Sequence, residues 1–116
     1  MATNYIGTGS FLANTVITHA LGVVISTNRG VDLATTTACD GYALTDAASG
    51  DYVTVAFLTN NGTLNGTMSV APVTVGNTIY LAASGAVSTT GTVTIGKSLT
   101  TTSTTAAVIE FIPKNI

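Results

Sequence analysis

Apolar side chains recur at every second position in several short stretches of this chain, and no window longer than ten residues spaces them as a helix would. Val53, Val55 and Phe57 share one face in this way, and the same alternation runs through residues 107–112. Threonine fills 24 of the 116 positions, and its branched Cβ favours extended backbone. The pattern predicts an all-β protein.

The predicted strands are short, and turn residues separate them. Asn61-Gly62 and Asn65-Gly66 offer the positive φ angles that tight hairpins require. Such spacing is typical of a small antiparallel β-sandwich or a barrel-like domain with short hairpins. Further strands are expected at residues 15–20, 21–27, 31–35, 63–70, 77–83 and 93–99.

The first dozen residues lack this alternation. We therefore expect an extended N-terminal arm over residues 1–12 and a single β domain over residues 13–116. The sequence shows no linker and no clear internal repeat.

Two charged residues bear on which face of a predicted strand is exposed. The alternation in residues 93–99 places Lys97 on the same face as Ile95 and Leu99. Glu110 lies between apolar neighbours. It is therefore either on the exposed face of an edge strand or buried and paired with a cation such as Lys97 or Arg29.

Charge is scarce: three Lys/Arg and five Asp/Glu make up 7% of the chain, against about 25% in a typical soluble domain. Three scattered cations cannot form the basic surface that a nucleic-acid binder needs. The apolar content of 46% excludes a disordered chain, and the longest apolar run, residues 20–25, is too short for a membrane span. Few charges are left to block edge strands, so we expect association to cover them.

No residue pattern in the chain points to catalysis. Residues 91–98 match the phosphate-binding pattern G-x-x-x-x-G-K-[ST], but β-branched residues fill its middle and a poor helix former follows. Cys39 and His19 are the only residues of their kinds and lie twenty positions apart, so neither an activated thiolate nor a metal cluster is indicated. We expect no enzyme activity, no cofactor and no small-molecule substrate.

Three acids, Asp40, Asp46 and Asp51, fall within twelve residues. One interpretation of this cluster is a structural cation site. The other is that Asp46 and Asp51 bind nearby backbone in turns beside glycine. The sequence leaves both open.

Three stretches carry a recognisable pattern. Residues 41–55, GYALTDAASGDYVTV, place a T-D-A-A-x-G turn between two strands. Residues 75–87, VGNTIYLAASGAV, have the pattern of a hairpin, and residues 94–99, TIGKSL, that of a short strand. In this order, over roughly residues 20–112, they resemble segments of small tailed-phage capsid decoration, or cement, proteins. Asn77 stands where those proteins usually have an acid.

The resemblance implies a non-enzymatic virion protein that is made in the host cytoplasm and binds the outer surface of an assembled icosahedral head. Such proteins typically form homotrimers that bridge neighbouring major capsid subunits, with no contact to nucleic acid or membrane. Because attachment is expected at the arm, Tyr5, Ile6 and Phe11 are the predicted contacts to the capsid or to a neighbouring subunit.

Two other functions remain open. A fibre or spike domain shares the threonine- and glycine-rich β composition, although fibres usually carry longer shafts or repeats. A carbohydrate-binding β-sandwich would need an exposed aromatic platform, usually with tryptophan, and the chain has no tryptophan.

Overall fold

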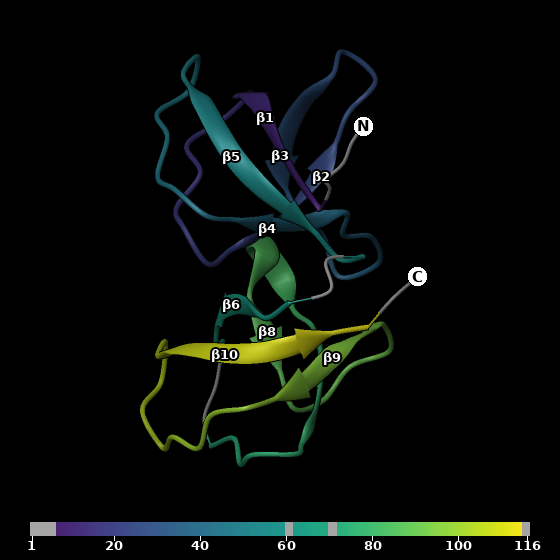
Figure 1. Cartoon of the computed structure of the whole chain (residues 1–116), viewed down its shortest axis with the longest axis vertical. Helices are drawn as coiled ribbons and strands as arrows, with labels where there is room; N and C mark the ends of the chain where they lie inside the picture. Colours follow the sequence, from purple (N-terminus) through teal and green to yellow (C-terminus); the bar gives the residue numbers. More distant parts are fainter. Residues whose placement is uncertain (1–6, 60–61, 70–71, 115–116) are drawn as a thin grey trace.

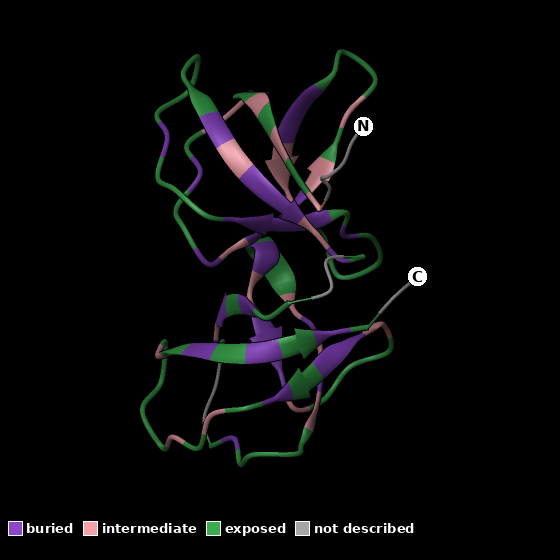
Figure 2. Ribbon diagram, in the orientation of Figure 1, coloured by how far each residue is buried: buried purple, intermediate pink, exposed green. Residues whose placement is uncertain are grey.

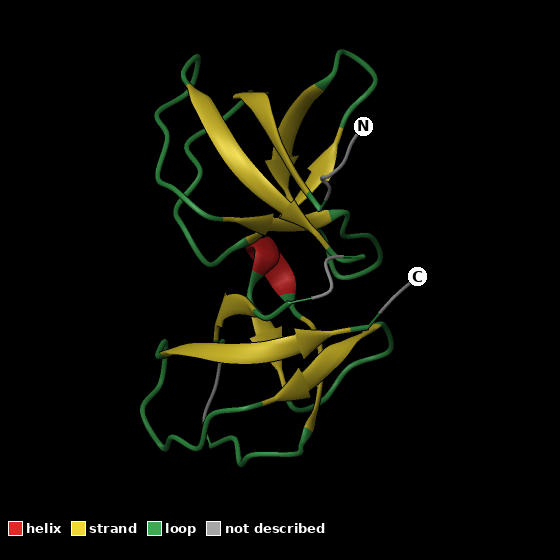
Figure 3. Ribbon diagram, in the orientation of Figure 1, coloured by secondary structure: helices red, strands yellow, loops and turns green. Residues whose placement is uncertain are grey.

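A computed structural model describes residues 7–59, 62–69 and 72–114. The chain is all-β, which confirms the predicted fold class, and its strands form two five-stranded units, one above the other in Figure 1. Figure 3 shows a single helical turn, η1, between the units. The elements are β1 (Thr8–Ala13), β2 (Gly22–Ile25), β3 (Gly30–Leu33), β4 (Gly41–Ala43), β5 (Tyr52–Phe57), β6 (Leu64–Thr67), β7 (Thr78–Leu81), η1 (Ala83–Gly85), β8 (Val87–Ser88), β9 (Thr94–Ser98) and β10 (Val108–Pro113). In the described part of the chain, no helix is long and apolar enough to cross a membrane.

The first unit, residues 7–59, is a closed barrel with the strand order β1-β3-β2-β4-β5. Antiparallel pairing of β1 with β5 and parallel pairing of Ala13 with Val31 close the ring. Closure satisfies backbone groups that an open sheet would leave unpaired at its edges. The buried core of this barrel consists of Ala13, Ile17, Val23, Val31, Ala43, Ala47, Val53 and Val55.

The second unit, residues 62–69 and 72–114, has the strand order β6-β10-β9-β7-β8. Its sheet curls until Met68, just after β6, forms a parallel bridge with Val87 in β8. The Ser69 amide donates a hydrogen bond to the Val87 carbonyl at 2.8 Å. The two edge strands therefore meet, as β1 meets β3 in the first unit.

The two units repeat one backbone plan. Strand partners and isolated bridges in the first unit recur 55 or 56 positions later in the second. The expectation that the chain holds no internal repeat is therefore wrong for the backbone, since few side chains agree between the units. Matching pairs, first unit then second, include Tyr42–Ala56 and Lys97–Ile112, Ile25–Val31 and Leu81–Val87, and Ile17–Ala47 and Val73–Thr102.

Unusual backbone angles repeat as well. Ala20 and its counterpart Gly76 have φ angles of 68° and 92°, and Gly50 and its counterpart Ala106 have 93° and 63°. A residue with a Cβ pays a conformational cost in this left-handed region, whereas glycine does not. The turn geometry is thus retained even where the glycine is not.

One hydrophobic core joins the two units. Tyr42 is fully buried, and its ring meets that of Phe111 edge to face, with the centroids 5.2 Å apart. At the margin of this contact the Thr67 amide donates to the Ala20 carbonyl at 2.8 Å. Figure 2 shows buried segments on the facing sides of the two units. The first unit also contributes Ala34, Cys39, Ala56 and Leu58 to this core.

Two titratable groups lie in the shared core. Burial raises the pKa of the Cys39 thiol from its ordinary 9.0 to about 11, and the thiol donates a hydrogen bond to the Gly41 carbonyl at 3.3 Å. Burial also raises the pKa of the Tyr42 hydroxyl well above 10, and the neighbouring Cys39 adds to this increase. Among the described residues, no nitrogen or oxygen atom pairs with the Tyr42 hydroxyl.

The expected face of residues 93–99 is wrong in one respect. Ile95 is buried, whereas Lys97 and Leu99 are exposed. The register of β7 against β9 shifts here, because adjacent β7 residues pair with Thr94 and Gly96 and leave Ile95 as an extra residue in β9. A bulge of this kind changes which face the following residues occupy.

Glu110 is exposed, as one of its two interpretations required, but β10 is not an edge strand. It pairs with β6 on one side and with β9 on the other. The Glu110 carboxylate accepts a hydrogen bond from the Thr63 hydroxyl at 2.6 Å. The alternation of buried and exposed residues along β10 is visible in Figure 2.

Two differences concern the N-terminal region. Residues 8–12, which the sequence places in the arm, belong to β1 and pair with β5. Gly9 and Ser10 interrupt the apolar alternation there, so the sequence carries no strand signal. The strand expected at residues 15–20 is wrong, since only Ile17 pairs, in an isolated bridge with Ala47.

The repeated φ angles predict opposite effects of two matched substitutions. Ala106→Gly should raise the free energy of unfolding by about 0.5–1 kcal/mol, because Ala106 is exposed and glycine removes the cost of positive φ. Gly50→Ala should lower it by about 1 kcal/mol, although an added Cβ would meet no atom within 4 Å. Urea unfolding of both variants measures the difference, and changes of the same sign would contradict this account.

The buried thiol and phenol predict loss of stability at high pH. Both groups stay neutral in the folded protein where they would ionise after unfolding, so their contribution is complete below pH 9 and declines as the pH rises toward 11. The decline due to Cys39 should be about 1.4 kcal/mol per pH unit. Urea unfolding as a function of pH measures it.

Two variants separate the contributions. Cys39→Ala should remove the decline between pH 9 and 10, whereas Tyr42→Phe should retain it and reduce the decline above pH 10. An unchanged pH profile in Cys39→Ala would show that another group is responsible.

Candidate interaction surface

Phe11 is the one predicted contact residue that the structure describes. It lies on β1, half-buried, and its ring meets that of Phe57 edge to face with the centroids 5.9 Å apart. Phe11 packs against the core of the first barrel, so only part of the ring is available to a partner. Tyr5 and Ile6 lie outside the described residues.

Exposed apolar side chains gather on the outer face of the first unit. Tyr52 is 69% exposed, and Leu12 is its partner on the neighbouring strand β1. Leu44, 42% exposed, follows β4, and its amide donates to the Thr54 carbonyl on β5. We call Leu12, Leu44 and Tyr52 the first patch.

The second unit has a corresponding patch. Val108 and Ile112 are 47% and 50% exposed on the outward side of β10. Leu99, exposed after β9, donates its amide to the Glu110 carbonyl of β10. We call Leu99, Val108 and Ile112 the second patch. Since Leu99 and Val108 are the counterparts of two first-patch residues, the repeat presents an apolar pair twice.

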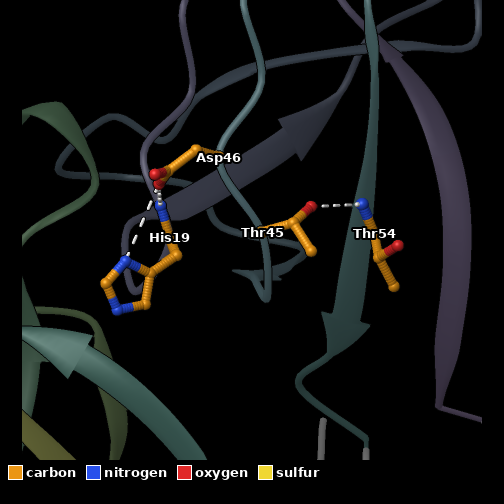
Figure 4. Close-up of polar contacts among 4 residues, drawn as sticks. All are labelled: His19, Thr45, Asp46 and Thr54. Carbon is orange, nitrogen blue, oxygen red and sulfur yellow. Dashed lines mark hydrogen bonds and ion pairs between the residues drawn. The ribbon is translucent and has the colours of Figure 1, made fainter.

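Side-chain hydrogen bonds hold the loop beside the first patch. The Thr45 hydroxyl accepts a hydrogen bond from the Thr54 amide at 3.2 Å, and the Asp46 carboxylate accepts one from the His19 amide at 2.8 Å (Figure 4). The His19 imidazole Nδ1 lies 3.7 Å from the same carboxylate oxygen. These contacts fix the chain between β4 and β5 against the loop that precedes β2.

The second unit holds its equivalent loop in the same way. The Thr100 hydroxyl accepts a hydrogen bond from the Glu110 amide at 3.0 Å, and the Thr101 hydroxyl accepts one from the Val75 amide at 3.1 Å. The Thr101 hydroxyl of the second unit thus accepts the hydrogen bond that the Asp46 carboxylate accepts in the first unit. The geometry of both patches therefore depends on local hydrogen bonds.

A hollow of about 340 Å³ adjoins the second patch. Mostly apolar surface lines it, including Ile112 of the patch. Two of the three cations in the chain, Lys97 and Lys114, are part of its lining. The remaining lining residues are Thr78, Thr94, Gly96 and Pro113.

Charge is divided unequally between the units. The first unit holds Arg29 and four aspartates, a formal net charge of -3, whereas the second holds Lys97, Lys114 and Glu110, a net charge of +1. No basic face suited to a phosphate backbone results from this arrangement.

Two of the three clustered acids bind backbone. Asp46 accepts from the His19 amide, and the Asp40 carboxylate accepts from the Ile25 amide at 2.7 Å. Asp51 is exposed in the turn before β5. Within the described ranges, no group of three or more His, Cys, Asp or Glu side chains is placed to hold a metal ion.

Sequence reasoning did not single out the two patches. The alternation did contain a signal, because Val108 and Ile112 are apolar residues at outward positions of a strand whose inward positions are also apolar. Leu12 and Leu44 carried no such signal, since β1 is poorly patterned and Leu44 follows β4, a strand of only three residues. Their exposure depends on how the barrel closes.

No protein-family model matches the chain, and no curated protein matches it. Among solved structures, the crystal structure of the N base of head fiber gp8.5 in bacteriophage phi29 is similar, with a TM-score of 0.76 and 13% sequence identity. The match covers 93% of each chain, so it includes both units and their arrangement. At this identity the similarity shows the fold.

The loop contacts predict how position 46 tolerates substitution. Asp46→Val should lower the free energy of unfolding by about 0.5–1 kcal/mol and speed hydrogen exchange of the His19 amide, because that amide loses its acceptor. Threonine has nearly the same shape as valine, but Asp46→Thr should retain the hydrogen bond from the His19 amide. In the second unit, the Thr101 hydroxyl accepts the equivalent hydrogen bond from the Val75 amide. Equal exchange rates in the two variants would contradict the assignment. Hydrogen exchange followed by NMR makes the comparison.

Proposed function

We propose that this chain is a structural virion protein that binds the outer surface of an assembled icosahedral phage head and bridges major capsid subunits. The observation that carries the proposal is the fold, both units together, which the chain shares with the base of a phage head fiber. The resemblance of residues 41–55, 75–87 and 94–99 to capsid decoration proteins supports the same assignment. The proposal includes no enzyme activity, cofactor or small-molecule substrate.

The two patches supply the surface for such binding. Each combines exposed apolar side chains with threonine hydroxyls, and the second patch also has Glu110 and Lys97 beside Ile112, a mixture suited to a protein interface. A protein that binds the assembled shell, but not the free capsid subunits, stabilises the shell by mass action. Many copies on one head multiply a small gain per site.

We propose a homotrimer as the binding form. The apolar patches on both units give one chain more than one surface for contact, so one patch can face a neighbouring copy while the other faces the capsid. Sedimentation velocity of the free protein, and cryo-EM of decorated heads, report the number of copies at each site. Single copies in both measurements would remove the trimer from the proposal.

A fibre base is the second candidate, because the similar solved structure is the base of a head fiber. A decoration protein acts as a separate module, whereas a fibre base anchors a shaft. Cryo-EM of particles that carry this chain separates the two. Density that ends at the two units supports decoration, and density that continues outward as a shaft supports the fibre base.

The patches predict which substitutions weaken binding to undecorated heads. Tyr52→Ser and Val108→Ser should each lower the affinity by about tenfold or more, because each removes exposed apolar area from a patch. Both side chains are outward-facing, so the free energy of unfolding should change by less than about 0.5 kcal/mol. Co-sedimentation with purified heads measures the affinity.

Val75→Ser is the matched control, because Val75 is 56% exposed and belongs to neither patch. Its binding should equal that of the unsubstituted chain. Deletion of residues 1–6, which spares β1, tests Tyr5 and Ile6 as contacts. Unchanged occupancy after this deletion would remove the arm from the interface, and unchanged binding by both patch variants would contradict the patches.

A further inference from the structure

The hollow of the second unit is the counterpart of a face that is covered in the first unit. In the ladder of β2, β4 and β5, Gly22 pairs with Tyr42 and Tyr42 pairs with Ala56. The second unit covers this face, and Tyr42, Ala56 and Leu58 are buried in the shared core. The residues at the same positions of the second unit are Thr78, Lys97, Ile112 and Lys114, all of which line the hollow.

Equivalent backbone hydrogen bonds identify Lys114 as the counterpart of Leu58. The Leu58 amide donates to the Asp40 carbonyl, and the Lys114 amide donates to the carbonyl of Ile95, the counterpart of Asp40. Lys97 and Lys114 thus occupy the places of Tyr42 and Leu58. The face that is apolar and covered in one unit carries two ammonium groups in the other.

The part of the second unit that covers the first unit is the turn η1, and this turn also has a counterpart in the first unit. The turn η1 packs against β2, and a Cβ added at Gly85 would overlap the backbone of Gly22. The equivalent turn of the first unit joins β2 to β3 and lies at the far end of the molecule (Figure 1). Arg29 stands there in place of Gly85, with φ angles of 69° and 81° at the two positions.

Polar side chains share this open end of the first unit with Arg29. They form a hydrogen-bonded network beside the turn between β2 and β3, which consists of Asn14, Ser26, Asn28 and Asp32. Exposed apolar surface lies there as well. Ile25 is 36% exposed, whereas its counterpart Leu81 is 3% exposed in the shared core. The chain therefore has an uncovered end on one unit and an uncovered face on the other.

All three cations of the chain lie at these two places. We propose that Arg29, Lys97 and Lys114 act as gatekeepers, which prevent the open end of one copy from docking on the hollow of another as the two units dock within one chain. Without them, the two surfaces would form a heterologous contact, and such a contact continues into open filaments unless its rotation closes a ring.

Two physical effects exclude the second copy. Covering the hollow would take the ammonium groups of Lys97 and Lys114 out of water, which costs free energy. The docking end would add the guanidinium of Arg29 to them, and the Asp32 carboxylate near that turn already accepts a hydrogen bond from Asn14. The Arg29 side chain would also have to fit where even a Cβ overlaps backbone in the contact within the chain. Edge and end charges of this kind are a known means of keeping β proteins from assembling.

The direct test removes the three gatekeepers by installing the residues of the covered interface. Arg29→Gly, Lys97→Tyr and Lys114→Leu together should produce oligomers whose average mass rises with protein concentration, at least about twofold above the original chain near 1 mM. The net charge changes from -2 to -5, so general repulsion between copies increases and cannot explain the association. Sedimentation velocity gives the masses.

Two partial variants make the test sharper. Arg29→Gly removes the cation from the open end of the first unit only. Lys97→Tyr with Lys114→Leu removes the cations from the hollow of the second unit only. Each variant alone should sediment as the original chain does, because one of the two charged surfaces remains. An equimolar mixture should form one-to-one pairs of the two variants, since each supplies the surface that the other lacks.

Circular dichroism and thermal unfolding confirm that the partial variants are folded, and glycine suits the positive φ at position 29. A mixture that sediments as its components would overturn the proposal, as would self-association of either partial variant alone. The inference does not depend on head binding. If the original chain is a trimer, the readout is the increase above the trimer mass.

Discussion

Closure of two very small sheets is the constraint on which the rest of the structure depends. A chain with 7% charged residues has few charges with which to block open strand edges. The parallel contact between Ala13 and Val31, and its equivalent between Met68 and Val87, lets each sheet meet itself. Association with partners was expected to cover the edges, but the chain already does so internally. The case for association rests instead on the exposed apolar patches.

The second constraint is the hydrophobic core that the two units share. The face of the first barrel around Tyr42 becomes part of the core of the second unit, with Phe111 beneath it. The repeat then diverges in side chains while its backbone is kept. Gly85 lies against Gly22, whereas the equivalent Arg29 is exposed to solvent. The same position of the repeat therefore holds a small residue where the two units are in contact and a charged residue where the surface is exposed.

Much of the fold could be predicted, and the reasons are local. The alternation of Val53, Val55 and Phe57 requires an extended strand, and β5 is that strand, with Val53 and Val55 buried. Ala56 on its other face is also buried, in the core that the units share, and Phe57 is half-buried. The bulge at Ile95 was not predictable, since it depends on the register of β7 against β9. Of the candidate site, Phe11 was named from the sequence, and the structure places it partly inside the barrel. The patches were missed because exposure is a property of the closed sheets.

The sequence by itself determined the all-β fold class, because branching at Cβ and period-two alternation act over a few neighbouring residues. It also determined that charge would play a small part in the surface. Only the tertiary structure decided that the chain repeats one unit twice, since the repeat lies in strand pairings and positive φ angles rather than in residue identity. Tertiary structure likewise placed the three cations at the two uncovered surfaces, because residues 29, 97 and 114 become comparable only when the two units are superposed by their hydrogen bonds.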